Sequence, residues 1–163
     1  MTHTSSFITS VEREVFDNAT HLFSTNTQVN LHNKNMLKSL NRPIALSIGA
    51  RSAAPKVIHI VKDEEQLNAQ VLLCQGQRIM LTSKIWTQVG LVNGTLGEIV
   101  DIIYSSGSKP PEVPLYIVTR IDNYIGSPWN EEDPKLVPII PLCLGSRRQI
   151  SITMDWAITI CKS

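Results

Sequence analysis

The stretch from Leu72 to Tyr104 constrains the fold of this chain more than any other. Two apolar runs, Arg78 to Trp86 and Gly97 to Tyr104, flank a turn at Val92-Asn93-Gly94-Thr95. Asn-Gly between apolar runs is the strongest short signal for a β-hairpin, because both central positions of that turn need positive φ. The second run is rich in Ile and Val, as strands are, and Gly97 suits a bulge or a close backbone approach. We therefore predict a hairpin at the centre of a small β-barrel.

Further short strands are expected after this hairpin. Residues 115–121, 136–142 and 149–154 are apolar or alternate between apolar and polar side chains. Loops that contain Gly and Pro, at 105–114 and 123–134, separate these strands. Several short strands with turn signals between them indicate a small barrel or sandwich.

The first part of the chain carries a different pattern, in which helices and strands alternate. The expected elements are a helix at 10–20, a strand at 21–24, a helix that begins at Thr25 or Asn26 and ends near Asn41 and Pro43, and a strand at 43–48. A strand at 56–61 and a short helix at 63–72 are expected to lead into the barrel. Helix, strand, helix, strand is the order that a parallel α/β sheet requires. We therefore predict an α/β part followed by a β part.

Composition excludes few classes of protein. The 163 residues suffice for one ordinary domain, and a hydrophobic content of 42% is enough for a core. The net charge of +1 argues neither for nor against nucleic acid. The cysteines are three and widely spaced, at Cys74, Cys143 and Cys161, so neither a metal site nor a disulfide framework is expected. No signal peptide or membrane-spanning run is evident, which predicts an intracellular chain with no membrane partner.

Three stretches of the sequence resemble the petite-integration-frequency (Pif-type) helicases, a group that includes the Helitron transposon helicases. The most specific is GQRIMLTSKIWTQVGLVNGTLGEIVDIIY at 76–104. Its family motif is carried by Gly76, Arg78, Met80, Thr82, Trp86, Asn93, Gly94 and Gly97. The second stretch, 22–44, resembles the fourth helicase motif, with Ser24 in place of the usual Pro. The third, 146–163, resembles the return to the helicase lobe, with Cys161 where His is usual and Asp155 where a small residue is usual.

The resemblance implies a partial second RecA-like lobe with an inserted Src-homology-3-like β-barrel. On this basis residues 1–72 would form the first part of the lobe, 73–145 the barrel, and 146–163 the return to the lobe. The parent would be an ATP-dependent 5′→3′ DNA helicase that uses ATP and Mg²⁺. The sequence contains neither a phosphate-binding loop nor an acidic pair for the metal, so we expect no catalytic residue and no cofactor in this fragment. The missing first RecA-like lobe would be one partner.

Single-stranded DNA is the other partner that the resemblance implies. By position in the family motifs, the DNA-contacting residues would be Thr25, Asn26, Thr159, Lys162 and Ser163. Hydroxyls, amides and a lysine of this kind contact phosphates and do not read sequence. The residues themselves leave another interpretation open, in which Thr25 and Asn26 cap a helix and Thr159 packs in a strand.

Other residues allow two interpretations each. Trp86 and Trp129 could stack on bases, but a place in the barrel core is favoured for Trp86. Arg147 and Arg148 could contact phosphate or form an exposed pair, and Arg78 is expected to be structural. Cys161 with His59 could suggest a nucleophile and a base, but a buried inert thiol is favoured.

Two functional alternatives to the helicase fragment stay open at this stage. One is a stand-alone β-barrel module that binds nucleic acid or protein. The other is an inactive transposon or gene remnant. A eukaryotic parent would act in the nucleus or the mitochondrion, and the sequence does not distinguish telomere maintenance, DNA recombination, DNA repair and transposition.

Overall fold

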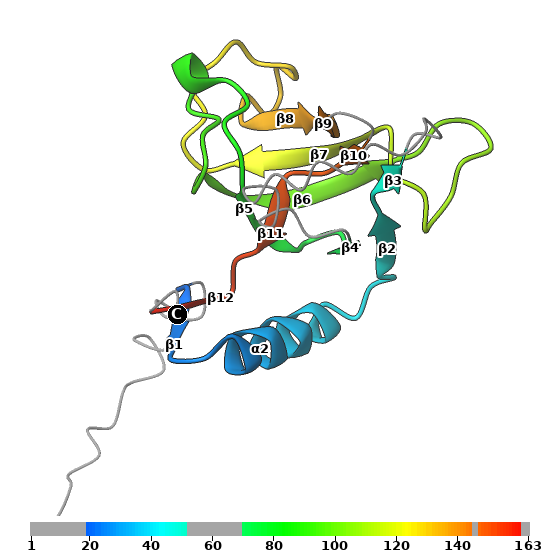
Figure 1. The fold of residues 1–163 in the computed structure, drawn as a ribbon. Coiled ribbons are helices and arrows are strands. Elements are labelled where there is room, and N and C mark those ends of the chain that lie inside the picture. The colour runs from blue at the N-terminus through cyan, green and yellow to red at the C-terminus, as the bar shows by residue number, and fades with distance from the viewer. Residues whose placement is uncertain (1–18, 52–69, 145–146, 161–163) are drawn as a thin grey trace, which may run out of the picture.

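The structure, a computed structural model, describes residues 19–51, 70–144 and 147–160. One long helix, α2 (Asn26–Ser39), lies at one end of a stack of short strands (Figure 1). The strands are β1 (His21–Phe23), β2 (Ala45–Ile48), β3 (Ala50–Arg51), β4 (Gln70–Leu73), β5 (Arg78–Leu81), β6 (Leu96–Ile103), β7 (Tyr116–Ile121), β8 (Leu136–Ile139), β9 (Leu142–Leu144), β10 (Arg147–Gln149), β11 (Ile152–Met154) and β12 (Ala157–Thr159). A short 3₁₀ helix, η2, spans Thr87–Val89. The helix expected at 10–20 lies largely outside the described residues, and the strand expected at 56–61 lies wholly outside them. Of the helix expected at 63–72, only residues 70–72 are described, and that part of the prediction is wrong, because they belong to strand β4 and pair with β2.

The main sheet is antiparallel and has the strand order β11-β5-β6-β7-β8. Its inner face is buried and largely apolar. The buried side chains include Ile79, Leu81, Ile99, Ile117, Ile121 and Ile139. The expected pairing of the two apolar runs is confirmed, because β5 and β6 are antiparallel neighbours. The other strands form three separate small sheets, and the described residues show no closed barrel.

The turn of the predicted hairpin differs from the expected one. Strand β5 ends at Leu81, and the chain then passes through η2 before it reaches the turn at 92–95. Within that turn only Gly94 has a positive φ, of 90°, so the prediction of two positive φ values is wrong. The Thr95 hydroxyl explains the change, because it accepts from the Val92 amide at 3.1 Å and donates to the Gly90 carbonyl at 2.8 Å.

Strand β2 also differs from the prediction. We expected it in the same parallel sheet as β1, but it pairs with β4 in an antiparallel ladder. Ala45 and Val71 on these two strands pack against the core of the main sheet, which accounts for the change. The parallel partner of β1 is β12, at the other end of the chain. The division of the chain at 72/73 and 145/146 stays a prediction.

A second, smaller core joins α2 to the strands. It consists of Leu37, Cys74 and Trp156, with Met36, Leu40, Leu72 and Met154 packed around them. Burial raises the pKa of the Cys74 thiol, whereas the nearby Arg42 lowers it. None of the helices among the described residues has the length and apolar character that a membrane crossing requires. The same residues contain no group of three or more His, Cys, Asp or Glu placed to bind a metal ion.

Candidate nucleic-acid interface

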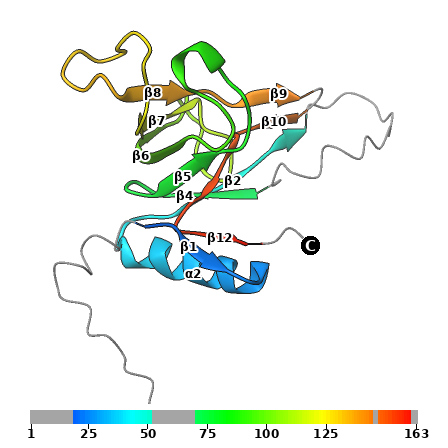
Figure 2. The ribbon, with the colours of Figure 1, turned by 90° about the vertical axis from the view of Figure 1, so that its left-hand side faces the viewer.

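Strands β1 and β12 end at the same edge of their two-stranded parallel sheet. In this register Phe23 lies opposite Thr159, and the Ile160 amide donates to the Phe23 carbonyl at 3.0 Å. The chain leaves β1 through Ser24 and enters α2 directly (Figure 2). Thr25 and Asn26, at the start of the helix, are therefore brought to the same edge as Thr159. Ligands of α/β sheets bind outside the carboxyl ends of parallel strands, which is this edge.

The first turn of α2 suits an anion. Thr25 is the N-cap, and its hydroxyl accepts from the Gln28 amide at 3.3 Å. The hydroxyls of Ser24 and Thr25 both donate to the Gln28 side-chain oxygen, at 3.1 and 3.0 Å. No acidic residue occupies this turn, and Thr25 and Asn26 are exposed. The amides of a helix N-terminus and its dipole attract phosphate, and no carboxylate opposes that here.

The contacts that hold β1, β12 and α2 together at this edge were not predicted from the sequence. Asn33 is buried, and its side-chain amide donates to the Ala157 carbonyl at 3.2 Å, which fixes β12 against α2. The rings of His21 and Phe23 pack on His32, with centroids 4.5 and 5.3 Å away. Burial lowers the pKa of the His32 imidazole, and the nearby His21 lowers it further. Asn33 lies within the stretch 22–44 that resembles the fourth helicase motif, and that resemblance was its signal in the sequence. No local pattern indicates the cluster of the His21, Phe23 and His32 rings.

Comparison with known proteins identifies the relatives of this chain. No protein-family model matches it. The chain is 26% identical over 145 residues to the ATP-dependent DNA helicase PIF1 of Danio rerio. That alignment covers 89% of this chain and 21% of the relative. The chain is Pif1-like.

Solved structures support the same relationship at the level of the fold. The Pif1 helicase of Candida albicans superimposes with a TM-score of 0.56 at 16% identity, covering 86% of this chain and 35% of that one. Bacteroides sp. Pif1 in complex with ADP-AlF4 gives 0.56 at 20% identity, covering 94% and 36%. Bacteroides Pif1 bound to ssDNA gives 0.54 at 19% identity, with the same coverage. The Pif1-like chain thus spans about a fifth of the curated relative and about a third of these structures.

The remaining predicted residues lie elsewhere or are not described. Lys162 and Ser163 lie outside the described residues, as do His59 and Cys161. Trp86 is 53% exposed, so its predicted place in the core is wrong. The reason is that β5 ends five residues earlier, at Leu81, and Trp86 instead directly precedes the 3₁₀ helix η2.

Arg148 and Arg78, for which the sequence left a role open, lie on other sheets of the Pif1-like chain. Arg148 is exposed on β10 and lines a shallow cavity of about 390 Å³ together with Glu112. Arg78, on β5, lies 3.9 Å from Asp122. Neither strand belongs to the β1–β12 sheet, so the structure does not bring these arginines into that pair of strands.

Asp155 lies where the Pif1-like chain passes from β11 to β12, and it is 2% exposed. Its carboxylate accepts from the Thr20 hydroxyl at 3.1 Å, and its amide donates to the Arg78 carbonyl at 3.2 Å. Burial raises the pKa of the Asp155 carboxyl, and the nearby Asp122 raises it further. The Thr20 hydrogen bond and the charge of Arg78 act in the opposite direction. Asp155 therefore ties the segment before β1 to the main sheet, at an electrostatic cost.

The raised pKa of Asp155 predicts the pH dependence of stability. A carboxyl with a raised folded-state pKa destabilises the folded chain at pH values above that pKa. The effect fades as the pH falls and is absent below the ordinary value of 3.8. Asp155→Asn is therefore expected to raise the free energy of unfolding near neutral pH, with a difference that shrinks toward about pH 4. Urea unfolding across this range measures it, with the exposed Glu131→Gln as the control. An equal response of both variants at every pH would contradict the prediction.

Proposed function

We propose that this chain is the DNA-gripping part of an ATP-dependent 5′→3′ DNA helicase. In this proposal the edge formed by Thr25, Asn26 and Thr159 holds the phosphates of single-stranded DNA, and Lys162 and Ser163 extend it. The supporting observation is the parallel pairing of β1 with β12, which brings residues from both ends of the chain to one helix N-terminus. The relative of Danio rerio is named an ATP-dependent DNA helicase, and a Bacteroides relative is described as bound to ssDNA.

The chemistry of this edge suits contacts to the DNA backbone. The exposed first turn of α2 has no carboxylate, and its free amides can each donate to a phosphate oxygen. Asn26 adds a side-chain amide on the same turn. Such contacts fix the position of a strand and carry no base specificity, as a translocating enzyme requires.

ATP hydrolysis belongs to the parent in this proposal. ATP and Mg²⁺ would bind to a first RecA-like lobe outside this sequence, because the 163 residues contain no phosphate-binding loop. A Bacteroides relative is described in complex with ADP-AlF4, which supports a nucleotide in the parent. The chain alone is then expected to turn over no ATP. Detectable hydrolysis by the purified chain, absent from a mock purification, would refute this part.

We also propose how the chain is divided. Segments 1–72 and 146–163 supply the partial RecA-like lobe, and 73–145 form the Src-homology-3-like insert. The β1–α2–β12 unit supports this, because it joins the first and last segments. Some strands of the lobe segments contact the main sheet. Strand β11 is one of its strands, and β2 and β4 pair with each other and pack against its core. They form the connection between the two parts.

Asn26→Asp separates DNA binding from helix capping. A negative charge in the first turn of a helix stabilises it by about 0.3–1 kcal/mol, but the same charge repels phosphate. We expect the variant to bind labelled oligothymidine about fivefold more weakly at low salt, while its free energy of unfolding stays equal or rises. Fluorescence anisotropy and urea unfolding measure the two effects.

Asn35→Asp is the matched control for this test. It makes the same change of charge on the exposed side of α2, more than two turns from the N-terminus. Its affinity for oligothymidine is expected to stay within about twofold of the unmodified chain. Equal weakening by both variants, or no binding of oligothymidine at low salt, would argue against the proposed interface.

A further inference from the structure

Three large apolar side chains are exposed at the end of the molecule away from α2. Trp86 is 53% exposed, Ile125 77% and Trp129 54%. They lie on two loops, residues 82–95 and 122–135, which stand side by side beyond the ends of the strands in Figures 1 and 2. The Ile125 amide donates to the Val89 carbonyl at 3.3 Å and joins the loops. We call Trp86, Ile125 and Trp129 the distal surface.

The loop that carries Trp86 is held by its own backbone. The Trp86 amide donates to the Leu91 carbonyl, and the Leu91 amide donates to the Trp86 carbonyl, both at 3.0 Å. The Ile85 amide shares the same Leu91 oxygen at 3.0 Å. The adjoining turn is fixed by the Thr95 hydroxyl. Trp86 is therefore presented from an ordered backbone.

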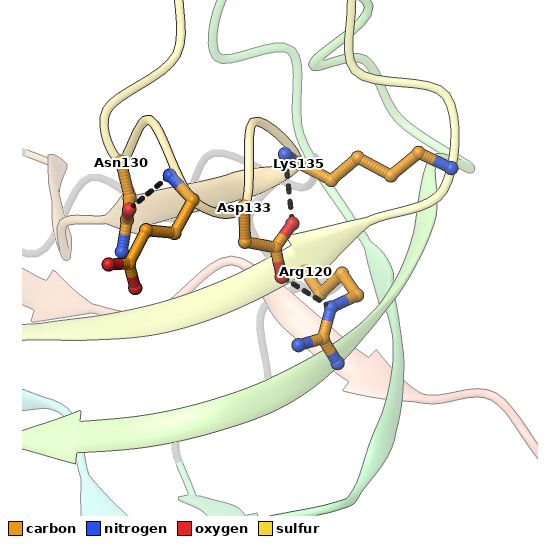
Figure 3. A network of polar contacts seen from close by, with 5 residues as sticks. Arg120, Asn130, Asp133 and Lys135 are labelled. Carbon is orange, nitrogen blue, oxygen red and sulfur yellow. Dashed lines mark hydrogen bonds and ion pairs between the residues drawn. The ribbon is translucent and has the colours of Figure 1, made fainter.

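The loop that carries Trp129 is held by polar side chains (Figure 3). Arg120 on β7 donates to the Asp133 carboxylate at 2.9 Å, and the Lys135 amide donates to the same carboxylate at 3.2 Å. The Glu132 amide donates to the Asn130 side-chain oxygen at 2.8 Å. The Arg120 guanidinium also lowers the pKa of Asp133, so this carboxylate keeps its charge and its bonds over a wide pH range.

Exposed tryptophans on ordered loops are characteristic of a binding surface. Trp is enriched among the residues that dominate protein interfaces, and exposed apolar side chains on neighbouring loops mark such sites. A surface that is already ordered loses little conformational entropy when a partner binds. Neither tryptophan belongs to either apolar core, so packing of this chain does not explain their presence.

The charges beside the distal surface distinguish between partners. In the part of the chain that the structure describes, the ion pairs are Arg78–Asp122 and Arg120–Asp133, so Glu131 and Glu132 have no cationic partner. These two exposed carboxylates follow Trp129 almost directly. The side chains of the two loops carry two positive and four negative charges, and the resulting net charge of −2 does not attract phosphates. A cationic group can instead pair with Glu131 and Glu132 while apolar side chains cover the tryptophans.

We propose that the distal surface docks a basic, apolar segment of another protein. Apolar side chains of the segment cover Trp86, Ile125 and Trp129, and its Lys or Arg residues pair with Glu131 and Glu132. This surface lies at the opposite end of the molecule from the β1–β12 edge, so a partner bound here leaves that edge free.

A fluorescein-labelled peptide of alternating Lys and Leu residues is the probe for this proposal. The full chain is expected to bind it with an anisotropy change, and to bind the Glu–Leu counterpart at least tenfold more weakly. Trp86→Ala with Trp129→Ala should weaken binding of the Lys–Leu peptide about tenfold or more. Glu131→Gln with Glu132→Gln should weaken it about threefold and reduce its salt dependence. Leu31→Ala, at an equally exposed position on α2, should leave it within about twofold.

Three outcomes would overturn the proposal. Equal binding of the Lys–Leu and Glu–Leu peptides by all variants would show that the peptides associate with the chain nonspecifically and not at the distal surface. Weakened binding of labelled oligothymidine by the double tryptophan variant, with unchanged peptide binding, would assign the surface to nucleic acid. Dimerisation in sedimentation velocity that the double tryptophan variant abolishes would assign it to a second copy of the chain. Circular dichroism spectra confirm that each variant is folded, which is expected because all the substituted side chains are exposed.

Discussion

Gly97→Ala is expected to lower the free energy of unfolding by about 3 kcal/mol. A Cβ atom at Gly97 would lie 2.5 Å from the Arg120 carbonyl oxygen and 3.0 Å from the Ile121 side chain. Gly97 pairs with Ile121 between β6 and β7, at the centre of the main sheet. The nearest obstacle is backbone, which cannot turn aside as the end of a side chain can. Strands β6 and β7 must therefore separate at this point, with loss of the packing around Ile121.

Gly107→Ala is the control for this prediction. Gly107 has a positive φ of 84° and no atom within 4 Å of an added Cβ, so only backbone strain is expected there, of about 1–2 kcal/mol. Gly97 has no positive φ, and only the steric contact acts on it. Urea unfolding measures both variants. A loss at Gly97 no larger than the loss at Gly107 would show that β6 and β7 do not approach as closely as the structure indicates.

The pairing of the main strands could be predicted because it depends on local pattern. Two apolar runs around a turn are enough to indicate an antiparallel pair, and β5 and β6 form one. Gly97 was expected at a bulge or a close approach, and the structure shows the close approach. The irregularity in the β6–β7 pairing lies instead between Ile99 and Asp101.

The details of the turn could not be predicted, because contacts between loops decide them. Asn-Gly indicated two positive φ values, whereas in the turn held by the Thr95 hydrogen bonds only Gly94 has one. Trp86 is apolar and close to a strand, which suggested the core, but the strand ends at Leu81 and the ordered loop holds its ring outside. Strand β2 has the composition of a parallel strand, yet its partner is β4. None of these contacts has a signature in neighbouring residues.

The candidate interface was predictable only in part. The cap at Thr25 has a local signal, and the structure contains it. The proximity of Thr159 to that cap depends on a pairing between strands more than 130 residues apart, which a resemblance can imply but a local pattern cannot. The ring cluster of His21, Phe23 and His32 had no signal, because it needs the strand and the helix to be packed first.

The second core determines whether the interface is held in place. Leu37 is 1% exposed and packs with Cys74 and Trp156. Cys74 precedes the strands of the main sheet in the sequence, and Trp156 follows them. This cluster places the helix beside the sheet, and Asn33 on the same helix then holds β12. The position of the β1–β12 edge therefore depends on apolar packing about three turns from the cap.

Leu37→Ala is expected to lower the free energy of unfolding by about 2–5 kcal/mol, because it leaves a cavity between α2 and the strands. Leu31→Ala, on the exposed side of the same helix, is the control and should cost less than about 0.5 kcal/mol. Hydrogen exchange measures where the loss occurs. Amides of α2 and β12 should exchange faster than in the unmodified chain, while those of β6 and β7 keep their protection. Equal loss of protection in all four elements would instead show that the helix and the main sheet unfold as one cooperative unit, and that the β1–β12 edge has no mobility of its own.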